Sequence, residues 1–316
     1  MNKKMKCLLK TTIFSTVSIH IANRVMNHLS TSQNILTTVQ GHQYAWKEGN
    51  IFYTKTGEGE PLLLVHHLFP DSSSYEWKQV VKELAHHYTV YAIDLVGCGR
   101  SAKPGILYTN YFYVQLLQDF IKHVIKQPTN LVVSKASASF GISQCCMNPD
   151  QVKKLILVNP DPISHSTALL SKRAQLRKYL LRLPIIGTFL YNLDMQHAVE
   201  KLKFRLRFWG QTNPHPEEWA WAYTESAYLN NSKGKHLLSS IENKMINSNI
   251  IHTISILHTP TMIIGSRDNE FIDETITQFQ ELNEHIDSIT IYGSKYLPQI
   301  DSPKQFCDCV HHYLSN

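Results

Sequence analysis

The stretch LVVSKASASFGISQCCMNPDQVKKLILVNP, residues 131–160, decides how this chain folds. It opens with the apolar run Leu131–Val133, passes through small residues into a helical stretch at Phe140–Met147, and closes with the apolar run Lys154–Val158. Short, continuous apolar runs are typical of strands that are buried on both faces. A strand, a helix and a second strand in this order predict two parallel strands joined by a crossover helix.

The same alternation continues on both sides of this segment. Further strands are expected at Ile51–Lys55, Leu62–Val65, Thr89–Asp94, Thr261–Gly265 and Ser288–Tyr292, and further helices at Tyr75–Ala85, Tyr111–Ile125, Glu274–Leu282 and Pro303–Leu314. Alternating strands and helices predict an α/β fold with a mostly parallel, doubly wound sheet. We therefore expect one large domain over residues 49–316.

One long interruption breaks this alternation, from about Ile163 to Asn231, and its sequence is typical of several helices. Ligands bind at the carboxyl ends of the strands in open α/β sheets, so a helical insertion at this point is expected to form a lid. Nine basic residues lie between Lys172 and Arg207, against two acidic residues. A solvated helix face is the usual explanation, and attraction to a membrane surface or an acidic ligand is the functional alternative.

The composition sets outer limits on fold and function. The 316 residues are 43% hydrophobic and 18% charged, which is enough for one large core and unlike a disordered chain. The formal net charge is +6, but no nucleic-acid-binding module is visible, so nucleic acid is not an expected partner. The six cysteines are scattered or adjacent, and no His or Cys spacing fits a zinc site. We expect free thiols and no metal.

The N-terminal segment, residues 1–48, is basic and lies outside the predicted domain. Lys10 and Arg24 bracket thirteen uncharged residues, which are too few and too polar to span a bilayer comfortably. The segment also lacks a clear signal-peptidase site, so secretion is disfavoured. Two alternatives stay open: a loosely docked helix, or an amphipathic helix lying on an anionic membrane. The expected location is cytoplasmic or peripherally membrane-associated.

Three segments together resemble the α/β-hydrolase family. Residues 61–77 are similar to the strand and His-Gly turn beside the oxyanion hole, and residues 91–104 contain the D-x-x-G-x-G-x-S turn. Residues 131–160 resemble the strand, nucleophile elbow, helix and next strand. The layout is most similar to the bacterial esterase, lipase and haloperoxidase-like branch. The resemblance implies a serine hydrolase of esters or related acyl bonds, with an apolar or acyl ligand in a lidded pocket and no cofactor.

The resemblance also implies roles for individual residues. Ser137 stands where the family carries its nucleophile, and the backbone amides of Ala138 and Leu68 would form the oxyanion hole. Ser139 is the alternative nucleophile if the motif is shifted by two residues.

Several positions depart from the family pattern. Lys135 replaces the glycine two residues before Ser137, and Tyr296 stands at the position of the catalytic histidine. A phenol is a poor base at neutral pH, so a serine beside it remains a weak nucleophile. Asp268 is the expected acid, with Asp161 as the alternative.

Three hypotheses follow from these departures. Lys295 or Lys135 would act as the base of an unorthodox serine hydrolase, since a desolvated lysine can activate a serine. Alternatively, the chain is a noncatalytic scaffold that binds an apolar ligand. The third hypothesis is a membrane-peripheral protein that attaches through its basic N-terminus and insertion.

Overall fold

The computed structural model describes residues 3–163, 172–207, 216–246 and 249–316, without the side chains of residues 3–11, 172–174 and 207. Eight strands form one sheet in the order β1-β2-β4-β3-β5-β6-β7-β8, in which β1, β2 and β4 pair antiparallel and all other neighbours pair parallel. The strands are β1 (His42–Trp46), β2 (Gly49–Thr56), β3 (Glu60–Val65), β4 (Tyr88–Ile93), β5 (Thr129–Ser134), β6 (Val152–Val158), β7 (Thr261–Ser266) and β8 (Ile286–Ile291).

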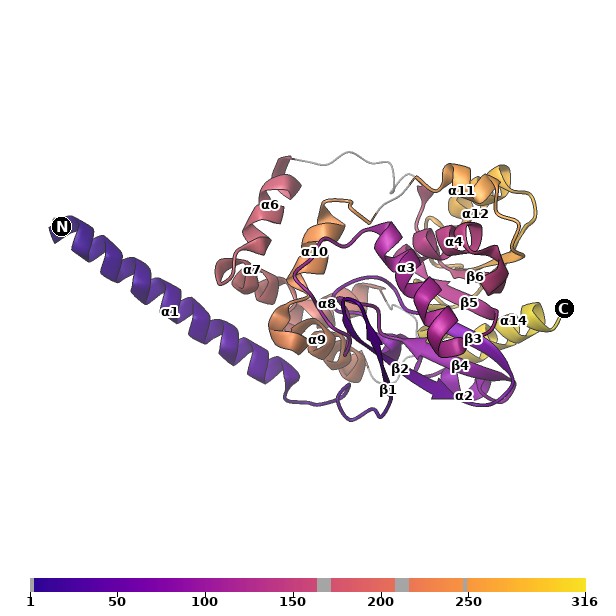
Figure 1. The fold of residues 1–316 in the computed structure, drawn as a ribbon, viewed down its shortest axis with the longest axis horizontal. Helices are drawn as coiled ribbons and strands as arrows, with labels where there is room; N and C mark the ends of the chain where they lie inside the picture. The colour runs from indigo at the N-terminus through magenta and orange to yellow at the C-terminus, as the bar shows by residue number, and fades with distance from the viewer. Residues whose placement is uncertain (1–2, 164–171, 208–215, 247–248) are drawn as a thin grey trace.

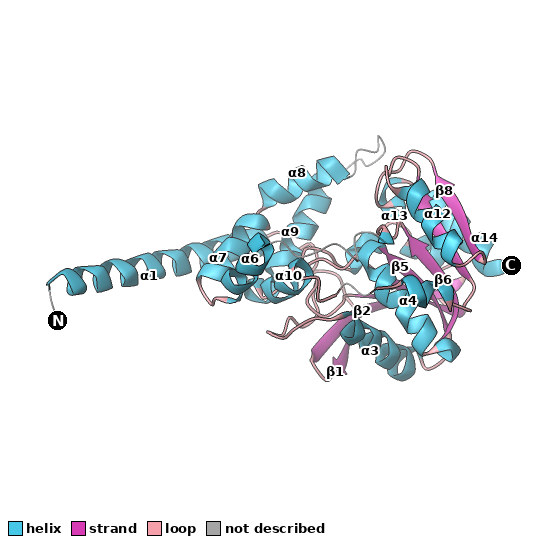
Figure 2. Cartoon of the chain, turned by 90° about the horizontal axis from the view of Figure 1, so that it is seen from above, coloured by secondary structure: helices cyan, strands magenta, loops and turns pink. Residues whose placement is uncertain are grey.

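Helices cover both faces of this sheet (Figures 1 and 2). The helices of the described residues are α1 (Lys3–Thr31), α2 (Val81–Leu84), α3 (Asn110–Phe120), α4 (Ala138–Met147), α6 (Lys172–Arg182), α7 (Ile186–Asp194), α8 (His197–Arg207), α9 (Pro216–Ser232), α10 (Lys235–Glu242), α11 (Ile251–Ser255), α12 (Ile272–Leu282), α13 (Pro298–Asp301) and α14 (Pro303–Ser315). Short 3-10 helices lie at Ser74–Trp77, Lys135–Ser137 and Pro149–Gln151, and a π-helical turn at Ile121–Ile125 extends α3.

The core lies in two layers, one on each face of the sheet. In β3, Leu63 and Val65 belong to the layer under α3, α4 and α12, whereas Leu62 and Leu64 belong to the layer under α2 and α14. Successive side chains of a strand point to opposite faces, so a strand between two helical layers must be apolar throughout. The continuous apolar runs in the sequence have this cause, and the predicted doubly wound α/β fold is confirmed.

The sheet begins earlier than the sequence-based domain boundary at residue 49. β1 lies within the segment set apart as residues 1–48, and it pairs antiparallel with β2 through a tight hairpin. Only Trp46 of this strand is buried, because β1 is the edge of the sheet. An exposed edge strand carries little apolar pattern, which is why the sequence did not reveal it.

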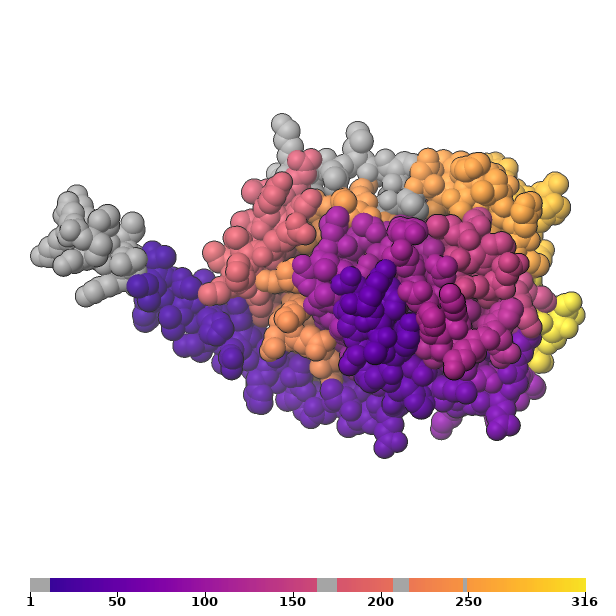
Figure 3. Space-filling view, viewed as in Figure 1, coloured from indigo at the N-terminus to yellow at the C-terminus, as the bar shows by residue number. Residues whose placement is uncertain are grey.

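The helical insertion between β6 and β7 contains α6 to α11 and continues past Asn231 as far as Ser255. The C-terminal half of α1 packs against it: the Asn23 amide donates to the carbonyl of Ile185 at 3.1 Å, and the Asn27 amide to that of Tyr228 at 2.7 Å. The rest of α1 projects away from the body of the protein (Figures 1 and 3). Among the described residues, no helix combines the length and apolar character that crossing a membrane requires.

Candidate functional site

A sharp turn joins β5 to α4 at the carboxyl end of the sheet, and Lys135 occupies its apex. β5 ends at Ser134, and the backbone of Lys135 has a φ of +50°, a conformation that is strained for a side chain of this size. α4 begins three residues later and lies close to β5, because a Cβ on Gly141 would come within 2.9 Å of the Val133 methyl groups. This strained strand-to-helix turn has the shape of a nucleophile elbow.

Ser137 lies behind this apex. Its side chain is completely buried, and its hydroxyl donates a 2.6 Å hydrogen bond to the carbonyl of His66. The half-buried Ser139 hydroxyl accepts from the Asn110 amide at 3.1 Å and lies 3.2 Å from the carbonyl of Ala136. The geometry therefore assigns the apex to Lys135, whereas the sequence pattern assigned the nucleophile position to Ser137.

A small cavity of about 80 Å³ opens beside the turn. Five of the residues that the sequence singled out line this cavity: Leu68, Lys135, Ala138, Ser139 and Asp161. The remaining walls are mostly apolar and come from the elbow, the insertion and α12: Ala136, Pro162, Ile241, Ile246, Ile250 and Phe279. Ser137, Asp268, Lys295 and Tyr296 are not part of this lining.

The amines of two lysines lie near the ring of Tyr296. The Nζ atom of Lys135 is 4.6 Å from the ring centroid, and that of Lys295 is 5.5 Å from it. Ammonium groups at these distances are attracted by the face of an aromatic ring. Lys295 also donates at 3.1 Å to the carbonyl of Leu206 in the last turn of α8. The residue at the family's histidine position thus faces the apex, but it offers a cation-binding ring instead of an imidazole.

The two predicted acids differ in their surroundings. Asp161 lines the cavity, whereas Asp268 is exposed, and among the described residues its carboxylate makes no hydrogen bond or ion pair. A third acid, Asp301, lies buried near Tyr296 in sequence. Burial raises the pKa of Asp301 to about 6, against the effect of hydrogen bonds from the Lys295 amide and the Ser294 hydroxyl. An acid oriented toward a base is therefore not apparent here.

Glu76 is a residue of this site that the sequence analysis missed. Its carboxylate is fully buried and accepts from the His67 amide at 3.1 Å and from the side chain of Gln299 at 2.6 Å. Burial raises its pKa to about 7, although hydrogen bonds from Ser134, His67 and Gln299 and the charge of Lys135 act in the opposite direction. The only signal was an acid placed between two aromatic residues, Tyr75 and Trp77.

The D-x-x-G-x-G-x-S turn has a structural role. The Asp94 carboxylate accepts from the amides of Ser74 and Arg100 and from the Arg100 guanidinium, at 2.7–2.8 Å. Gly99 has a φ of +48°, and a Cβ there would lie 2.3 Å from this carboxylate. Burial alone would raise the pKa of Asp94, but Arg100 holds it well below its usual range. Through these hydrogen bonds the motif fixes the conformation of the loop after β4, and it contributes no residue to the cavity.

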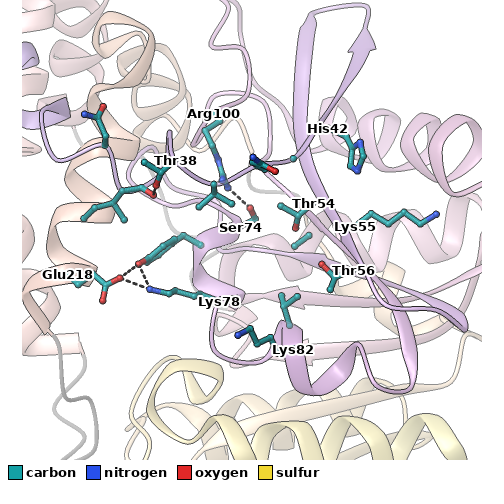
Figure 4. A pocket seen from close by; sticks show the side chains of 18 of the residues that line it. Thr38, His42, Thr54, Lys55, Thr56, Ser74, Lys78, Lys82, Arg100 and Glu218 are labelled. Carbon is teal, nitrogen blue, oxygen red and sulfur yellow. Dashed lines mark hydrogen bonds and ion pairs between the residues drawn. The ribbon is translucent and has the colours of Figure 1, made fainter.

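A larger cleft of about 870 Å³ lies elsewhere, between the segment after α1 and the edge of the sheet (Figure 4). The Tyr75 hydroxyl donates to Glu218 at 2.5 Å on its wall, and Lys78 donates to both groups. None of the predicted site residues lines this cleft. The larger volume of this cleft therefore does not identify it as the site that the sequence predicts.

The described residues contain no cluster of three His, Cys, Asp or Glu side chains placed to hold a metal ion. Over the same part of the chain the cysteines are free thiols: Cys98, Cys145, Cys146, Cys307 and Cys309. Cys7 falls in the segment whose side chains are not described.

Comparison with known proteins agrees with this architecture. The family model for the alpha/beta hydrolase fold matches residues 61–303, so the chain belongs to this family. Among solved structures, a serine hydrolase of carbazole degradation (the CarC enzyme) superposes with a TM-score of 0.70 at 18% identity, over 87% of this chain and 98% of that one. A bacterial membrane phospholipase A superposes with a TM-score of 0.69 at 16% identity, over 98% and 97%.

Matches in sequence are shorter. A haloalkane dehalogenase of Agrobacterium fabrum is 30% identical over 127 residues, which are 39% of this chain and 41% of that protein. Epoxide hydrolase 3 of Xenopus tropicalis is 31% identical over 159 residues, 48% and 43% of the two chains. The chain thus spans about two fifths of the length of these relatives. The family therefore rests on the match of the family model over residues 61–303, and the particular activity is a separate question.

Proposed function

We propose that this chain keeps the α/β-hydrolase scaffold without the hydrolysis that depends on a serine and a histidine, and that its cavity binds a small ligand. The observation that carries the proposal is the pairing of Lys135, at the turn apex, with the ring of Tyr296 at 4.6 Å. An acyl-enzyme needs an oxygen or sulfur nucleophile beside a base. Here a lysine stands at the apex and a tyrosine stands at the histidine position, so neither member of the serine–histidine pair is present at the turn.

The other candidate groups add support. The hydroxyl of Ser137 is buried and committed to the His66 carbonyl, so it does not face a ligand in the cavity. The buried ring of His66 accepts from the Leu95 amide through Nε2, and its Nδ1 lies 2.7 Å from the His67 carbonyl, so both nitrogens are engaged. Loss of a coupled triad lowers kcat by about 10⁶-fold, which leaves little measurable hydrolysis.

A panel of p-nitrophenyl esters with short and long acyl chains tests this proposal. We expect the rate with wild type to equal that with Ser137→Ala, both near the uncatalysed background. Tyr296→His alone should stay inactive, because it restores a base without a nucleophile. The pair Lys135→Ser and Tyr296→His should be the first variant with activity above background.

The same panel can overturn the proposal. Hydrolysis by wild type that Ser137→Ala abolishes would mean that Ser137 is the nucleophile after all, with an unorthodox base. Circular dichroism of each variant serves as the control for folding.

A second proposal, association with a membrane surface, rests on α1. Its exposed apolar side chains recur at every fourth position, Ile13, Val17, Ile21, Val25 and Leu29, with Phe14 beside the first. Residues four apart lie on one slowly winding face of a helix. The first ten residues contribute four lysines, which would complement anionic lipid.

The adjoining insertion extends this surface. Leu176 and Tyr179 of α6, Leu183, and Ile186 of α7 are exposed, and α7 packs against α1. Figure 1 has α1, α6 and α7 at one end of the molecule. The structure that matches 98% of this chain is that of a protein described as a membrane phospholipase A, which adds support by likeness of fold. We propose that this end lies on the lipid surface, with α1 parallel to it.

Sedimentation with vesicles that contain anionic lipid tests the second proposal. The double variant Phe14→Ser, Ile21→Ser should bind at least about tenfold more weakly than wild type, because each side chain buries apolar surface in the lipid. The matched control is Ile289→Ser, Tyr292→Ser, which removes two exposed apolar side chains at β8, at the far end of the sheet. Equal losses in both variants would contradict a specific role for α1.

A further inference from the structure

Lys135 lines the cavity at the apex of the elbow, and its Nζ lies against the ring of Tyr296. Its side chain is half-buried and lines the 80 Å³ space, and its backbone holds a positive φ that a lysine rarely adopts. Strained backbone of this kind persists where the surrounding structure enforces it, and it collects at functional sites. The helix that follows this turn, α4, packs closely on β5 through Gly141.

The cavity walls restrict what could meet this amine. Leu68, Ala136, Ile246 and Phe279 make the lining apolar, and Asp161 is the one carboxylate among the lining residues. A water molecule occupies about 30 Å³ of liquid, so 80 Å³ holds a ligand of only a few non-hydrogen atoms. A small, uncharged molecule fits these walls, since a carboxylate would lie near Asp161.

Two ionisable groups, Lys295 and Glu76, lie near Lys135. Lys295 shares the ring of Tyr296 and is held at the C-terminal carbonyls of α8, where a positive charge is stabilised. Glu76 lies close enough to Lys135 for their charges to interact, and it exchanges protons near neutral pH because of its raised pKa.

We propose that Lys135 captures a small, uncharged aldehyde or ketone as an imine. The lone pair of the neutral Nζ attacks the carbonyl carbon, and the carbonyl π electrons move to oxygen. Nζ loses a proton and the oxygen gains one, which gives a carbinolamine. Loss of that oxygen as water, with a further proton, leaves the C=N bond. No oxidant or reductant is consumed. The inference rests on the proposed replacement of the oxygen nucleophile at the same turn.

Reductive trapping tests the inference on the full wild-type chain. The protein is incubated with 2-butanone and cyanoborohydride, which reduces an imine to a stable secondary amine, and the modified lysines are mapped by mass spectrometry of chymotryptic peptides. We expect Lys135 to be modified at least about tenfold faster than Lys295 or the exposed Lys55, because the cavity holds the ketone against the amine. Adducts spread evenly over the lysines, or absent from Lys135, would overturn the inference.

Two comparisons sharpen the result. Lys135→Arg keeps the positive charge but cannot form an imine, so it should lose the fast-reacting site, whereas Lys295→Arg should retain it. Pyruvate should be trapped less than 2-butanone, and a preference for pyruvate would overturn the assignment to an uncharged carbonyl. The ester panel is independent: hydrolysis there contradicts the proposed function, whereas a missing Lys135 adduct contradicts the imine alone.

Discussion

Replacing Arg100 by alanine is expected to lower the free energy of unfolding by about 3–5 kcal/mol at neutral pH. The Arg100 guanidinium is 2.7 Å from the Asp94 carboxylate, with only 8% of the arginine side chain and none of the aspartate side chain exposed. The guanidinium carbon also lies 3.7 Å from the Phe52 ring centroid. Removing the arginine leaves a buried carboxylate without its counter-charge, which costs more than the pair itself contributes.

The matched control for this variant is Arg267→Ala. Arg267 also makes a two-oxygen contact, with Asp273 at 3.0 and 3.1 Å, but 49% of the arginine side chain and 68% of the aspartate side chain are exposed. Exposed pairs contribute about 0–1 kcal/mol, so this loss should be small. Urea unfolding followed by tryptophan fluorescence measures both. Similar losses of unfolding free energy in the two variants would contradict a special role for the buried ion pair between Arg100 and Asp94.

The pH dependence provides a second check on Arg100. Because the folded-state pKa of Asp94 is depressed, its contribution is present above the unfolded value of 3.8 and is lost as the pH falls below it. In Arg100→Ala the carboxyl group keeps its backbone amide donors but loses the guanidinium, which is the largest influence that favours its charged form. The difference in unfolding free energy between wild type and variant should therefore shrink as the pH falls toward 3. A difference that is independent of pH would argue that lost packing against Phe52, instead of lost charge, destabilises the variant.

Much of the fold was accessible from the sequence because burial on both faces leaves a continuous apolar run. β3, β5, β6 and β7 follow from such runs. β1 did not follow, because an edge strand exposes most of its residues. The local sequence pattern therefore predicts buried strands better than it predicts the exposed strand at the edge of the sheet.

The site was less accessible because the elbow sequence VSKASASFG fits more than one register. The sequence pattern placed the nucleophile at Ser137, which put Lys135 at a position where the family has glycine. The end of β5 at Ser134 and the positive φ of Lys135 assign the apex instead, and both are properties of the folded backbone. Glu76 was invisible for a related reason, since neither its complete burial nor its contact with Gln299 can be inferred from residues near it in sequence.

Glu76→Gln is expected to make the protein more stable at alkaline pH than wild type, by an amount that disappears in acid. The folded-state pKa of Glu76 is raised to about 7 from an ordinary value of 4.5, so the folded state binds this proton more tightly than the unfolded state does. Stability from this group is complete below pH 4.5 and is lost as the pH rises through 7. The loss amounts to about 3 kcal/mol for a fully buried carboxyl group, at roughly 1.4 kcal/mol per unit of pKa.

Glutamine resembles the protonated carboxyl group in shape and carries no charge, so the variant lacks this loss. The measurement is the free energy of unfolding in urea for both proteins between pH 4.5 and 8.5. The difference, variant minus wild type, should rise by about 2–3 kcal/mol over this range and level off above pH 7. Asp301, whose pKa is raised to about 6, titrates in both proteins and cancels in the difference. The exposed Glu58→Gln is the control.

The outcome also bears on the chemistry proposed for Lys135. A difference that stays flat from pH 4.5 to 8.5 would mean that the lysine charge keeps Glu76 ionised throughout, and the two groups would then form a fixed ion pair with no proton to exchange. A difference that rises through pH 7 would mean that the carboxyl group takes up and releases a proton near neutrality, within reach of the charge on Lys135. The strained turn would then carry an amine within range of the charge of a group that exchanges protons near neutral pH, and such a group can assist the proton transfers of imine formation.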